Sequence, residues 1–106
     1  MQNETIKTNS IVHTPDENTE YYNRARVLIE TLKDKPREAY SIDSLLYHTK
    51  VRNEAFVLSH YDGFSERKRL LLQLLHAEAA LACDDVYETL KECGYTEEEL
   101  DMFSLL

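Results

Sequence analysis

Residues 66–93 form a stretch of 28 residues without glycine or proline, and it is apolar nearly all the way around a helix. A surface helix carries one apolar stripe, whereas a helix that is apolar on several sides has to be covered on several sides. Between Leu70 and Cys83 only three residues are polar. This segment is therefore predicted to form one long helix that is either central in a helical bundle or the seam of an oligomer.

Three apolar stripes with helical spacing run along this segment. The first consists of Leu71, Leu75, Ala79, Ala82, Val86, Leu90 and Cys93. The second consists of Leu70, Leu74, Ala77 and Leu81, and the third begins with Leu72, Ala80, Cys83 and Tyr87. We take the second stripe as the candidate oligomer seam. The alanines at 77, 79, 80 and 82 would let another helix approach closely there.

Helix start and stop signals divide the rest of the chain. Thr14 is a candidate N-cap, Pro15 suits the first helical position and Glu17 completes a capping box, so a helix is expected from there to about residue 35. Residues 41–61 fit either one bent helix or two short ones. Gly63 is expected to end this stretch in the left-handed conformation.

The long helix also has a start and a stop signal. Ser65 is expected to cap it, and Gly94 is expected to end it. A second capping box then begins at Thr96 and predicts a short terminal helix. With only 2 Gly and 2 Pro, the chain lacks the turn residues of a β-rich fold. We therefore expect an all-α bundle of four to five helices.

The 106 residues suit one domain. Residues 1–13 are polar and are expected to form a flexible tail, and residues 14–106 a single helical domain. No segment approaches the ~20 apolar residues of a membrane span. The first residues also lack the apolar stretch of a signal peptide. The expected location is the cytoplasm.

Charge is distributed unevenly along the chain. Residues 1–76 carry eleven acidic and eleven basic side chains, whereas residues 77–106 carry nine acidic and one basic, which accounts for the net charge of -8. The long helix begins with the basic cluster Arg67, Lys68 and Arg69, and it ends with Asp84, Asp85, Glu88 and Glu92. Both placements oppose the helix macrodipole. The arrangement indicates either a solvated surface that tolerates this cost, or a partner or ligand that compensates it.

Recognisable catalytic and metal-binding patterns are missing from the sequence. The four histidines, at 13, 48, 60 and 76, show none of the spacings of metal sites. Cys83 and Cys93 fall on one helix about 15 Å apart, too far for a disulfide. No nucleophile stands in a familiar setting. We expect no enzymatic activity, no metal and no cofactor.

Two short stretches of the sequence are similar to known functional motifs. Asp43-Ser44-Leu45 resembles the tripeptide around the modified serine of acyl carrier proteins, but the match covers three residues, and a helix of 28 residues does not suit that compact fold. Residues 41–61 are also compatible with a helix-turn-helix. Lys50 and Arg52 offer little neutralisation of phosphate, so direct nucleic-acid binding is not expected.

The charge clusters suggest two further functions. Carboxylates at 84, 85, 88 and 92 would mimic the phosphates of a nucleic acid in an acidic inhibitor, as in some phage counter-defence proteins. Alternatively, Ser65, Arg67, Lys68 and Arg69 at a helix N-terminus resemble a site for an anionic ligand such as a nucleotide.

The function that we expect is that of a non-enzymatic helical protein-interaction or regulatory protein, bound to itself or to a protein partner. In an antiparallel homodimer through helix 66–93, the basic start of each helix lies beside the acidic end of the other. Such pairing compensates both charge clusters and buries the surplus apolar surface. It also has the two-fold symmetry common among homo-oligomers.

Overall fold

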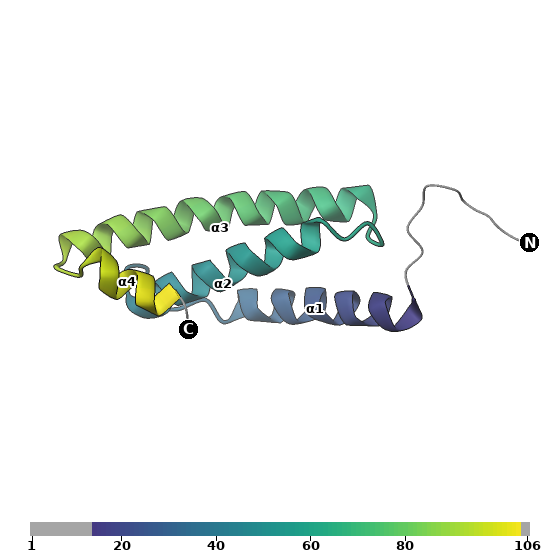
Figure 1. The fold of residues 1–106 in the computed structure, drawn as a ribbon, viewed down its shortest axis with the longest axis horizontal. Helices are drawn as coiled ribbons and strands as arrows, with labels where there is room; N and C mark the ends of the chain where they lie inside the picture. The colour runs from purple at the N-terminus through teal and green to yellow at the C-terminus, as the bar shows by residue number, and fades with distance from the viewer. Residues whose placement is uncertain (1–13, 105–106) are drawn as a thin grey trace, which may run out of the picture.

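The computed structural model describes residues 14–104, which contain four α-helices and no strands (Figure 1). They are α1 (Pro15–Lys33), α2 (Ile42–Ser59), α3 (Glu66–Glu92) and α4 (Glu97–Ser104). The predicted all-α class, the number of helices and the long helix are confirmed. The expected tail, residues 1–13, lies outside the described residues. None of the four helices is long and apolar enough to cross a membrane.

The predicted caps account for most of the helix boundaries. Thr14 Oγ1 accepts a hydrogen bond from the Glu17 amide at 3.0 Å, and Ser65 Oγ accepts one from the Lys68 amide at 3.2 Å. Thr96 forms the complete capping box, because its Oγ1 accepts from the Glu99 amide while Glu99 Oε1 accepts from the Thr96 amide. Each bond satisfies an amide that has no partner within its helix.

Both glycines lie beyond helix ends, but they act differently. Gly94 has a φ of 111°. The Gly94 amide donates a hydrogen bond to the Lys91 carbonyl and the Tyr95 amide donates one to the Leu90 carbonyl, so α3 ends in a Schellman motif. Gly63 does not take a positive φ, so the expectation of a left-handed residue there is wrong. A Cβ at Gly63 would overlap the Tyr61 ring, so this position needs glycine for close approach.

Residues 42–59 form one continuous helix, which decides between the one-helix and two-helix alternatives. Ser41 caps it by accepting a hydrogen bond from the Ser44 amide at 3.1 Å. The helix-turn-helix reading of this segment is therefore wrong. Ser44 is only 1% exposed, so it is not presented for modification as the serine of a carrier protein is.

The other three helices pack around α2, which contacts α1, α3 and α4 (Figure 1). One apolar core, built from all three long helices and the α2–α3 loop, contains Ala25, Leu28, Val51, Ala55, Leu58, Tyr61, Phe64, Leu72 and Ala79. A second core near α4 contains Leu45, Val86, Leu90 and Leu100. In both cores α3 contributes residues from the face that lies on α2.

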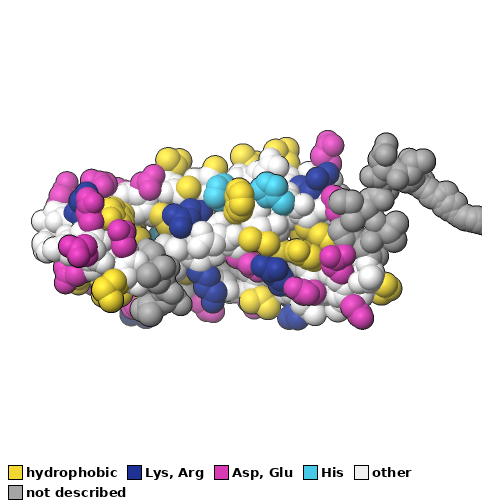
Figure 2. All heavy atoms as spheres, in the orientation of Figure 1, with side chains coloured by type: hydrophobic (Ala, Val, Ile, Leu, Met, Phe, Trp, Pro, Cys, Tyr) yellow, Lys and Arg dark blue, Asp and Glu magenta, His cyan; other side chains and the backbone are white. Residues whose placement is uncertain are grey.

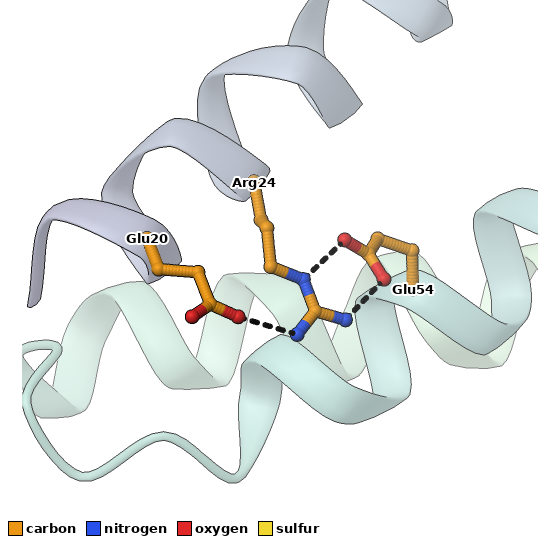
Figure 3. A network of polar contacts seen from close by, with 3 residues as sticks. All are labelled: Glu20, Arg24 and Glu54. Atoms are coloured by element: carbon orange, nitrogen blue, oxygen red, sulfur yellow. Dashed lines mark hydrogen bonds and ion pairs between the residues drawn. The ribbon is translucent and has the colours of Figure 1, made fainter. Parts of the chain in front are cut away.

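An ion pair also joins α1 to α2. Arg24 Nε and one terminal nitrogen donate to the two carboxylate oxygens of Glu54 at 2.9 and 2.7 Å, and Glu20 lies on the other side of the guanidinium at 3.9 Å (Figure 3). The Arg24 and Glu54 side chains are each about one third exposed. The planar guanidinium matches a carboxylate in this two-bond geometry and fixes the register of the two helices.

Candidate interaction surface on the long helix

The outward face of α3 is apolar over its first two thirds. Leu70 is 54% exposed, Leu74 59% and Leu81 72%, and Ala77 between them is exposed as well. These four residues, which we call the α3 seam, are the second stripe of the sequence analysis. Apolar side chains line the edge of the molecule that α3 forms in Figure 2. The described part of the chain does not cover them.

The α3 seam is the middle of a longer heptad pattern. Its residues are three or four positions apart, and the same alternation extends it by one residue at the start and two at the end. The complete exposed series is Arg67, Leu70, Leu74, Ala77, Leu81, Asp84 and Glu88. The apolar seam therefore has a base at one end and acids at the other, all on one face.

The core face of α3 combines residues of the first and third stripes. Leu71 is 56% exposed and Cys93 is exposed, whereas Leu72 and Cys83 of the third stripe are buried. The position of α2 determines which residues of α3 are buried, because α2 packs against one face of α3. That face contains Leu72, Ala79, Cys83, Val86 and Leu90. Of the alanines expected to admit another helix, Ala79 belongs to this core and Ala77 faces outward.

The basic cluster does not form one site. Arg67 is exposed and makes no hydrogen bond or ion pair within the described residues. The Lys68 ammonium lies over the rings of Tyr22 and Phe64, at 4.7 and 4.4 Å from their centres. Arg69 is half-buried, and its Nε has neither solvent access nor a hydrogen-bond partner in this part of the chain. The three cations point apart because adjacent residues diverge by about 100° on a helix.

The acidic cluster is partly engaged within the molecule. Asp85 accepts a hydrogen bond from the Tyr40 hydroxyl at 2.7 Å, and this bond raises the pKa of Tyr40. Glu88 lies 3.5 Å from the Lys91 ammonium. Asp84 is exposed and makes neither a hydrogen bond nor an ion pair with residues 14–104. Acidic side chains gather at the end of the molecule formed by α4 and the end of α3 (Figure 2).

The histidines that the structure describes lie apart from any cluster of metal ligands. His76 Nδ1 is 3.1 Å from the Arg52 carbonyl and His60 Nδ1 is 2.8 Å from the Phe56 carbonyl. Burial lowers the pKa of His48. In residues 14–104, no group of three or more His, Cys, Asp or Glu residues is placed to hold a metal ion.

A groove of 620 Å³ between α1, α2 and α4 is a feature that the sequence analysis missed. Its apolar wall consists of Val27 and Leu28 of α1, Leu46 of α2 and Phe103 of α4. The Arg24–Glu54 pair also lines the groove. These residues come from three helices that are distant in sequence, so no local pattern indicates them.

Comparisons of the chain with known protein families, with curated proteins and with solved structures found no match. The geometry of the described residues is therefore the basis for a functional assignment.

Proposed function

We propose that this chain is a non-enzymatic helical interaction protein and that the α3 seam is its binding surface. The observation that carries the proposal is the exposure of three leucines by more than half on one face of the longest helix. Soluble monomers rarely expose large contiguous apolar patches, and such patches often mark sites of protein contact. The heptad spacing of these residues is typical of a surface that packs against another helix, so we expect the partner to present a helix there.

The charge clusters give weaker support to the other functions. An anion site needs convergent donors, whereas Arg67, Lys68 and Arg69 point in different directions. A phosphate mimic needs free carboxylates, whereas Asp85 and Glu88 already have partners inside the molecule. The α3 seam has no such internal partner among the described residues. The α3 seam is therefore the surface to which we assign the binding function.

Site-specific photo-cross-linking in the native host tests this function. A photoreactive amino acid at Leu74 or Leu81 is expected to give discrete cross-linked species after irradiation, because both side chains would face a bound protein. The control is the same amino acid at Ile29 on α1, which is similarly exposed at 55%. Absence of adducts from both seam positions, or equal adducts from Ile29, would contradict the proposal.

A further inference from the structure

We propose that the partner of the α3 seam is a second copy of this chain, packed antiparallel with Leu70 opposite Leu81 and Leu74 opposite Ala77. This inference rests on the proposed function, because it names the partner of the same surface. It also specifies a register, which the arrangement of apolar and charged residues on the outward face determines.

The register follows from the heptad positions. In an antiparallel pair, residues of one helix meet residues whose numbers run in the opposite direction, so the numbers of facing residues have a constant sum. Placing Leu70 opposite the partner copy's Leu81 also brings Leu74 opposite Ala77 and Arg67 opposite Asp84. Each small residue then faces a large one, and every apolar seam position meets an apolar position. Close packing of this kind is what knobs-into-holes contacts require.

The charges at the ends of the α3 seam favour this register over the alternatives. Arg67 and Asp84 are both exposed and unpaired within residues 14–104, and the proposed dimer pairs them twice, once at each end. Parallel packing would place Arg67 against Arg67 and Asp84 against Asp84. An antiparallel shift by one heptad would place Asp84 against Leu74. A shift by one heptad in the other direction would place Leu81 against residue 63, which lies outside α3. The unshifted antiparallel arrangement alone pairs all four seam residues with one another and also avoids like-charge contacts and a buried acid.

The shape of the molecule permits this contact. Because α3 forms one edge of the molecule (Figure 1) and the seam residues on it are exposed, a second α3 can reach the seam along this edge. From Arg67 to Asp84 the contact would run about 25 Å along the helix. A seam of this length on one helix face is a small interface, and small interfaces are typical of weaker complexes. We therefore expect association at micromolar concentrations.

Sedimentation velocity of the purified full chain tests the stoichiometry. The chain is expected to be a dimer at tens of micromolar and to dissociate on dilution. Leu74→Glu should weaken the dimer at least tenfold, because it places a carboxylate within the seam. Ile29→Glu is the matched control, since Ile29 has a similar exposure but lies on α1, and it should leave the mass unchanged. Circular dichroism checks that both variants remain helical.

A charge exchange tests the register. Arg67→Asp and Asp84→Arg should each weaken the homodimer at least tenfold, because each variant places like charges opposite one another. Mixing the two variants should restore a dimer containing one chain of each, since each chain then offers the charge that the other lacks. Parallel packing predicts a different result for the single variants. Residue 67 would then face residue 67, so each variant would only exchange one like-charge contact for another and would not weaken the homodimer.

Failure of this inference differs from failure of the proposed function. A monomer at 100 µM together with seam-specific cross-links to another protein in cells would overturn the second copy as partner and retain the α3 seam as a binding surface. A dimer that is unaffected by Leu74→Glu and by both charge variants would overturn the inference by placing the contact elsewhere. Absence of cross-links from the seam in cells and of a dimer in solution would overturn both.

Discussion

Single residues decide how firmly α1 is attached, and the Arg24–Glu54 pair is the clearest case. The hydrogen bonds that Glu54 accepts from Arg24 hold the pKa of Glu54 below its ordinary value, whereas burial of the carboxylate acts to raise that pKa. The same bonds raise the pKa of Arg24. A lowered carboxyl pKa means that the folded state favours the ionised form. The resulting stability is present above the ordinary pKa of 4.5 and is lost as the pH falls through the folded-state pKa.

Replacing Glu54 by glutamine should therefore destabilise the chain in a pH-dependent way. At pH 7 we expect the free energy of unfolding to fall by about 1 kcal/mol, the usual size of such a partly exposed pair. The difference between wild type and variant should shrink as the pH falls through the folded-state pKa of Glu54, because below that pKa both side chains are neutral. Urea titrations at a series of pH values from 7 downward measure this. Glu20→Gln is the control, since Glu20 is 66% exposed and 3.9 Å from Arg24, and should cost less.

At the scale of the helices, Gly94 fixes the end of α3. Its φ of 111° is unfavourable for any residue with a Cβ, yet a Cβ there would meet no atom within 4 Å. Gly94→Ala is therefore expected to lower the free energy of unfolding by about 1 kcal/mol through backbone strain alone. Cys93→Ala provides the control, because Cys93 is exposed and has a φ of -81°. Equal stability of Gly94→Ala and wild type in urea titrations would show that the cap is dispensable.

The helices and their caps could be predicted from the sequence because the signals are local. Thr14, Ser65, Thr96 and Gly94 each act within a few residues of a helix end. The packed face of α3 could not be predicted in the same way. The helix is apolar nearly all round, so the position of α2 decides which of its residues are buried, and that contact is not local.

The charge clusters show a similar limit of sequence reasoning. Arg67, Lys68 and Arg69 are adjacent in sequence, but the helix turns them toward solvent, toward an aromatic pair and into a half-buried position. Of the four acids near the end of α3, Asp84 and Glu88 lie in the heptad series, and Glu88 already pairs with Lys91 whereas Asp84 makes no ion pair within residues 14–104. In both cases the direction of a side chain, rather than its position in the sequence, determines which partner it can meet.

For the whole molecule, the outward face of α3 relates stability to association. Leu70, Leu74 and Leu81 contribute little to the fold of one chain because more than half of each remains exposed. Their burial against a second copy would add stability without changing the fold. The two cores hold the four helices together, and the α3 seam remains available for a further contact.

The unfolding temperature should therefore rise with the concentration of the chain. Association that involves only folded chains stabilises the folded state by mass action, whereas a monomer unfolds at the same temperature at every concentration. For a domain of this size, each tenfold increase above the dissociation constant is expected to raise the midpoint by roughly 2 to 5 °C. Calorimetry from 5 to 500 µM measures this.

Leu74→Glu shows whether that concentration dependence arises at the α3 seam. The variant should unfold at one temperature throughout the series, close to that of dilute wild type, because Leu74 is 59% exposed and outside both cores. Ile29→Glu should retain the dependence of the wild type. A concentration dependence that persists in Leu74→Glu would place the contact on another face. A flat series for the wild type would mean that the second copy does not bind.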